Sequence, residues 1–115
     1  MHATLGRGEI LLISVDHRHE GRQAAVVEFL GQTTPLNSGI ARLARRHHAS
    51  LLPIYGLPLP DGRLRITIGP ALENGATADT VERITQRSAD VLGAVIREHP
   101  QYWMWSHRRL WGRAP

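Results

Sequence analysis

Ala78-Asp-Thr-Val-Glu-Arg-Ile-Thr-Gln-Arg-Ser-Ala-Asp-Val-Leu-Gly-Ala-Val-Ile-Arg-Glu98 is the stretch whose pattern most strongly fixes the fold. Its apolar residues fall on one face of an α-helix; they are Val81, Ile84, Val91, Leu92, Val95 and Ile96. Asp79 and Glu82 are favoured at the positive end of the helix dipole and Arg97 at its negative end, and Pro100 cannot continue the helix. We therefore predict one long helix from about Ala78 to Glu98.

The segments before this helix alternate between strand-like and helical patterns. The continuous apolar run over residues 10–15 is typical of a buried parallel strand. Residues 24–30 show a weaker extended pattern, and residues 31–39 hold turn-forming residues that predict a loop. Apolar residues from Ile40 to His47 recur at helical spacing and predict a short helix.

Two further strands complete the expected sheet. The strand predicted over residues 50–56 follows the short helix, and this order implies a right-handed crossover with a parallel strand pair. Residues 63–68 alternate polar and apolar side chains after a turn, so this strand should return antiparallel at the sheet edge. The sequence thus predicts a single α/β domain over residues 1–115, with a small mixed sheet, a crossover helix and a long C-terminal helix.

Composition excludes several classes of protein. The 115 residues include no cysteine, so disulfides and thiolate metal sites are impossible. No apolar run approaches the ~20 residues that span a bilayer, and residues 1–9 lack the apolar region of a signal peptide. All 14 basic residues are arginine, and the net charge is +4. This modest, scattered charge comes with no nucleic-acid motif, so we expect no nucleic-acid partner.

Two segments concentrate residues that bind anions. The stretch His99-Pro-Gln-Tyr-Trp-Met-Trp-Ser-His-Arg-Arg109 combines aromatic rings with adjacent arginines, which suits a partner that is both anionic and apolar. The stretch Asp16-His-Arg-His-Glu-Gly-Arg22 follows the first predicted strand, at the end where open α/β sheets bind ligands. Either segment can instead be structural, with arginines in ion pairs and tryptophans covering the sheet.

Several segments in one register resemble the bacterial lipid A biosynthesis acyltransferases, the lauroyl and myristoyl transferase family. They are Val15-Asp-His17 with Gly21-Arg22, Val27–Gly31, Thr33-Thr34 with Gly39–Ala44, Leu52-Pro-Ile54, Asp61-Gly62 with Leu64–Ile68 and Pro70, and the segment from His99 to Arg109. The last of these is the most specific.

The resemblance implies a partial glycerolipid-acyltransferase-like fold and a known reaction. A fatty acyl group moves from acyl carrier protein, or from coenzyme A, to a hydroxyl of a lipid A precursor. The reaction takes place at the cytoplasmic face of the bacterial inner membrane, and no cofactor is implied. The resemblance also implies Asp16, Arg22, Arg108 and Arg109 as substrate-binding residues.

The chain departs from the family at its catalytic motif. The family uses His-x-x-x-x-Asp/Glu, in which the histidine acts as general base on the acceptor hydroxyl. The fifth residue after each of the seven histidines is Arg, Arg, Ala, Leu, Pro, Met and Gly in turn, and none is acidic. We therefore expect no catalytic residue in this chain, which resembles the C-terminal half of such an enzyme and should be inactive without an upstream half.

Other interpretations stay open at this point. The chain can belong to an acyltransferase with another acceptor, such as a phosphatidylinositol mannoside, or act as a non-catalytic module that binds anionic membrane surfaces. The arginines at 42, 45 and 46 share a helix face that is either only solvated or a contact for a membrane or an acidic carrier protein. A metal site at His17 and His19 lacks a third, distant ligand.

Overall fold

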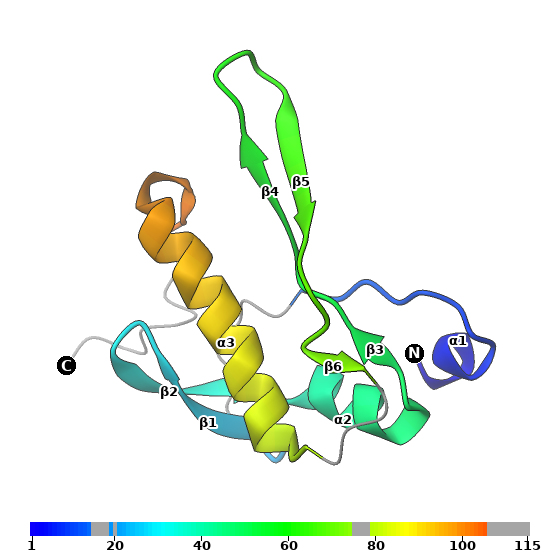
Figure 1. The fold of residues 1–115 in the computed structure, drawn as a ribbon. Coiled ribbons are helices and arrows are strands. Elements are labelled where there is room, and N and C mark those ends of the chain that lie inside the picture. Colours follow the sequence, from blue (N-terminus) through cyan, green and yellow to red (C-terminus); the bar gives the residue numbers. More distant parts are fainter. Residues whose placement is uncertain (15–18, 20, 75–78, 106–115) are drawn as a thin grey trace.

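The computed structural model describes residues 1–14, 19, 21–74 and 79–105, and Figure 1 shows the arrangement of their helices and strands. The elements in chain order are α1 (His2–Gly6), β1 (Ala24–Phe29), β2 (Gln32–Asn37), α2 (Gly39–His47), β3 (Ser50–Leu51), β4 (Ile54–Pro58), β5 (Leu64–Ile68), β6 (Glu73–Asn74), α3 (Val81–Glu98) and the 3₁₀ turn η1 (Pro100–Tyr102). The predicted α/β class and the long C-terminal helix are confirmed.

Strand pairing differs from the prediction. The described strands form three two-stranded sheets, β1–β2, β3–β6 and β4–β5, and each pair is antiparallel. The expected parallel pair is therefore wrong within the described ranges. α2 does connect two strands, but β2 and β3 belong to different sheets. The antiparallel return of the strand near residues 63–68 is confirmed, because β5 pairs with β4 from Leu64 to Ile68.

The predicted strand over residues 10–15 is also wrong in its described part, since residues 10–14 have no strand partner. Ile10 is 96% exposed and Leu12 is 77% exposed. An apolar run favours a strand only when a neighbouring strand supplies its hydrogen bonds, and the described residues provide none here.

The predicted loop over residues 31–39 is instead mostly strand β2. β1 and β2 join through Leu30 and Gly31, which both have positive φ, as a two-residue hairpin requires. Thr34 and Leu36 then face the core opposite the inward residues of β1. Burial of this alternate face outweighs the turn preference of the Gly, Pro and Asn residues.

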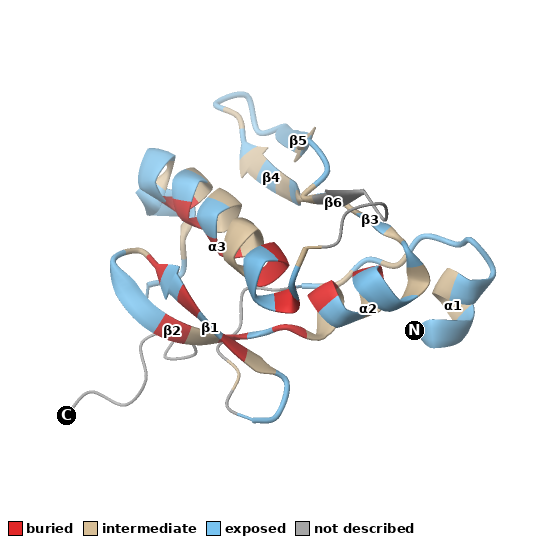
Figure 2. Ribbon diagram, turned by 60° about the horizontal axis from the view of Figure 1, so that its bottom comes forward, coloured by how far each residue is buried: buried red, intermediate tan, exposed pale blue. Residues whose placement is uncertain are grey.

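The core lies where α3 packs on β1 and α2 (Figure 2). One cluster joins the hairpin to α3 through Val27, Phe29, Leu36, Ala89 and Ile96. A second cluster joins α2 to the start of α3 through Ala41, Val81 and Ile84. Both clusters contact the apolar stripe of α3, whereas side chains on the other side of the helix, such as Glu82, Asp90 and Arg97, are exposed.

The N-terminal helix α1 is held to α2 by a histidine pair. Nδ1 of His2 lies 2.8 Å from Nε2 of His47, and the two rings share one hydrogen bond. Desolvation, followed by the charges of Arg46 and His47, lowers the pKa of His2 from its usual value. The neutral form of His2 is therefore the form that the fold stabilises.

We expect this contact to weaken in acid. Because the pKa of His2 is lower in the folded chain, the unfolded chain binds more protons, and stability rises with pH. The contribution is present above the unfolded pKa of about 6.5 and is lost as the pH falls through the folded value. Hydrogen exchange of the α1 amides should accelerate, after correction for intrinsic rates, between about pH 7.5 and about pH 5. His2→Gln should remove this pH dependence, and unchanged corrected rates in the native chain would contradict the assignment.

Candidate functional site

An apolar groove runs beside α3, on the side away from the β1–β2 hairpin. Its volume is about 170 Å³. Its lining residues are Leu11, Leu12, Ile13, Ile40, Leu51, Leu52, Pro53, Ile54, Tyr55, Leu72, Ser88, Val91, Leu92 and Val95. None of these side chains carries a charge, which suits a hydrocarbon ligand more than a polar one.

The two faces of α3 explain the groove. Ala89 and Ile96 point into the core cluster with the hairpin, whereas Ser88, Val91 and Val95 lie on the groove side. The amphipathic stripe predicted from sequence is therefore divided between a packed face and a face open to a ligand. The few polar atoms in the groove include the Ser88 hydroxyl, which already donates to the carbonyl O of Ile84 at 3.1 Å.

The apolar run that begins at Ile10 contributes to the lining of this groove. Leu11 and Ile13 are half-buried along one wall, although they form no strand. Another wall comes from residues 51–55, which run from the end of β3 into the start of β4. Three segments far apart in sequence thus meet only in the folded chain.

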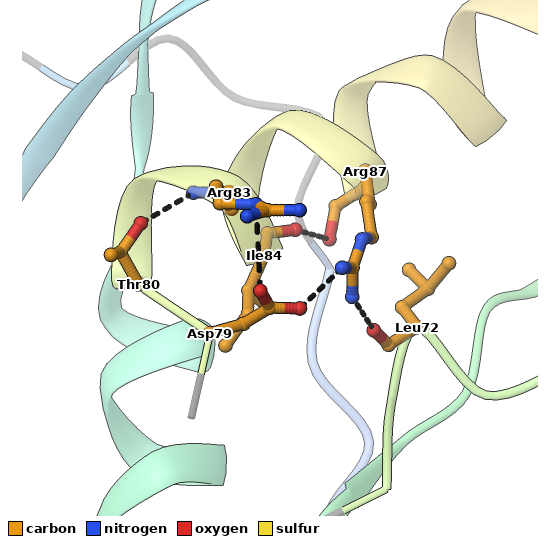
Figure 3. A network of polar contacts seen from close by, with 7 residues as sticks. Leu72, Asp79, Thr80, Arg83, Ile84 and Arg87 are labelled. Carbon is orange, nitrogen blue, oxygen red and sulfur yellow. Dashed lines mark hydrogen bonds and ion pairs between the residues drawn. The ribbon is translucent and has the colours of Figure 1, made fainter. Parts of the chain in front are cut away.

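A polar network ties one wall of the groove to α3 (Figure 3). Asp79 pairs with Arg87 and lies 3.4 Å from Nε of Arg83. Nη1 of Arg87 also donates to the carbonyl O of Leu72 at 2.8 Å, and the Leu72 N–H donates to the carbonyl O of Leu51. Leu72 and Leu51 both line the groove, so this network holds their backbone against the helix.

Sequence reasoning missed this positioning role. Asp79 was expected only to suit the helix dipole, but the helix begins at Val81 and the Thr80 Oγ1 caps it by accepting from the Arg83 N–H. The spacing of Asp79, Arg83 and Arg87 by four residues was the available signal, because it places the three side chains along one line of a helical surface.

Only one of the four expected substrate-binding residues lies in the described part of the chain. Arg22 is exposed in the turn before β1. The next residue, Gln23, accepts hydrogen bonds at its carbonyl O from the N–H and hydroxyl of Ser38, at the start of α2. Asp16, Arg108 and Arg109 lie outside the described residues, as does His17 of the alternative metal site.

The aromatic tail is described as far as Trp105. Trp103 packs against the core cluster of α3 and the β1–β2 hairpin, so it covers the hairpin as the structural interpretation expects. Trp105 is half exposed, and its indole N–H donates to the carbonyl O of Pro100 at 2.8 Å. Trp111 lies outside the described residues.

The sequence that forms this groove matches a known protein family. A model of the bacterial lipid A biosynthesis acyltransferases matches residues 1–111, which is nearly the whole chain. The chain belongs to this family. The resemblance first noted from sequence motifs is thereby confirmed, and acyl transfer in lipid A biosynthesis is the activity of the family.

A comparison with curated proteins finds no match to the chain. Among the described residues, no helix combines the length and the apolar character that crossing a bilayer requires.

Proposed function

We propose that this chain binds the fatty acyl group during its transfer to a hydroxyl of a lipid A precursor, at the cytoplasmic face of the bacterial inner membrane. The donor is acyl carrier protein or coenzyme A. The observation that carries the proposal is the uncharged groove beside α3. Each methylene that moves from water into such a groove contributes about 0.8 kcal/mol, so a long acyl chain gains several kilocalories per mole.

The reaction needs a base, and this sequence lacks the spacing with which the family provides one. A base removes the proton of the acceptor hydroxyl, and the oxygen attacks the thioester carbonyl. The C–S bond then breaks, and the sulfur leaves as a thiol with the proton that the base gives back. None of the seven histidines has an acidic residue five positions later. We therefore assign binding to this chain and assign the base to a second polypeptide segment that carries the family motif.

The β4–β5 hairpin supplies a surface for that segment. It extends away from the other elements in Figure 1. One of its faces is apolar. Ile54, Ile66 and Ile68 lie on this face and are each about half exposed or more. In the described part of the chain β4 and β5 pair only with each other, and an isolated two-stranded hairpin is marginal in water. Added strands would satisfy both its edges and its face.

Anionic groups of the substrates have a separate role in the proposal. Arg22 precedes β1 in an exposed turn and is available to a phosphate oxygen. Asp16, Arg108 and Arg109 are assigned to the same substrate from the family resemblance. The groove would take the acyl chain, and these residues would orient the charged part of the donor or acceptor.

A reconstitution assay tests this function. Lauroyl carrier protein and a tetraacylated lipid A precursor are incubated with the chain, with the segment that carries the His-x-x-x-x-Asp/Glu motif, and with both. We expect acylated product only from the mixture, and less of it when the chain carries Ile66→Asp on the hairpin face. Ile10→Asp, at an exposed position outside the hairpin, is the matched control.

Two outcomes would change the conclusion. No product from the mixture, with both polypeptides folded, would exclude the proposed reaction. Product from the chain alone would show that it carries its own base. A parallel incubation with phosphatidylinositol mannoside as acceptor distinguishes the lipid A precursor from that alternative.

A further inference from the structure

The outward face of α2 is a concentrated basic surface. Arg42, Arg45 and Arg46 are all exposed and lie on one side of the helix. α2 contains no acidic residue, and neither does α1, which packs against it. The whole sequence between Glu28 and Asp61 lacks Asp and Glu. In the described part of the chain, Arg45 and Arg46 make no ion pair.

Helix stability does not account for this surface. Arg45 and Arg46 in the last turn suit the negative end of the helix dipole. Arg42, however, stands in the N-terminal half of α2, where the dipole opposes a cation, and like charges three or four positions apart repel each other. Nε of Arg42 donates to the Ser38 hydroxyl at 3.2 Å, which leaves the outer nitrogens of the guanidinium for an external anion.

The chemistry of α2 favours an acidic protein over a bilayer. Helices that lie on membranes place large apolar side chains beside their cations. None of the exposed large apolar residues lies on α2, whose apolar side faces α3 and the groove. Only solvated arginines are presented outward, and these complement carboxylates on a protein surface.

The location connects this surface to the groove. Ile40, in the first turn of α2, lines the groove, and Arg42 follows it by two residues on the outward side. A protein docked on the arginines would therefore stand beside the apolar site. From this we infer that α2 is the docking surface for the acidic acyl carrier protein that delivers the acyl chain, an inference that rests on the proposed function.

Binding of purified holo-acyl carrier protein to the complete chain tests the inference. Arg45→Glu with Arg46→Glu should weaken the affinity by about tenfold or more, and binding to the native chain should weaken as salt is added. The matched control is Arg65→Glu with Arg97→Glu, which makes the same charge change at exposed positions on β5 and α3. The control should keep most of the native affinity, and thermal unfolding should show that both variants are folded.

Several outcomes would overturn the inference. The carrier protein would not bind, or the two variants would lose affinity equally. The third such outcome is that the chain binds only to vesicles that contain phosphatidylglycerol. The measurement is independent of acyl transfer. If the carrier protein binds through α2 but the reconstitution assay gives no product, only the proposed function is contradicted. If product forms equally with the α2 variant, only the docking surface is contradicted.

Discussion

Val91→Trp should strongly reduce binding of a long fatty acid to the chain. Val91 is half-buried on the groove side of α3, and an indole at this position would occupy space that an acyl chain needs. If the ring excludes about three methylene groups, the loss is roughly 2.4 kcal/mol, or about fiftyfold in affinity. Titration with a fluorescent fatty acid measures the effect directly.

The matched control for this substitution is Val26→Trp. Val26 is 67% exposed on the outward face of β1 and does not line the groove. It should leave the affinity close to that of the native chain. Equal affinities of the two tryptophan variants would show that the groove beside α3 does not hold the acyl chain.

Phe29→Ala should be the most destabilising single change in the β1–β2 hairpin. The ring is 2% exposed and contacts the cluster that joins the hairpin to α3. Removal of a buried phenyl ring costs about 3–5 kcal/mol, against a total stability of about 5–15 kcal/mol for a typical domain. Urea unfolding followed by circular dichroism should show a large fall in the transition midpoint.

Val26→Ala provides the comparison, because it truncates an outward side chain of the same strand. Surface changes of this kind usually stay within about 0.5 kcal/mol. A loss below about 1 kcal/mol for Phe29→Ala would mean that the cluster of α3 and the hairpin is not the principal core.

Local patterns were sufficient where the structure depends on neighbours in sequence. The helices near residues 40–47 and 81–98 and the antiparallel return of β5 follow from periodicity and turn residues. The strand predicted over residues 50–56 is divided between β3 and β4, which belong to different sheets. These elements satisfy their hydrogen bonds within a few residues or across a short turn, so their signals are contained in the segment itself.

The predictions from sequence were wrong where strand formation depends on a partner that is distant in sequence. Residues 10–14 carry a strong strand pattern but have no paired strand among the described residues. β2 carries loop residues but pairs with β1 and buries Thr34 and Leu36. Strand preference mostly reflects packing against neighbours, which a local window does not contain.

The sequence by itself determined the family, the α/β class, the long helix α3 and the absence of a His-x-x-x-x-Asp/Glu pair, because these depend on motifs and short-range periodicity. Only the tertiary structure decided that one face of α3 is left for a groove. The walls of that groove come from residues 11–13, 51–55 and 72, which meet because Arg87 and the core clusters hold separate segments against one helix. A cavity is formed by packing between distant segments, and no single segment encodes it.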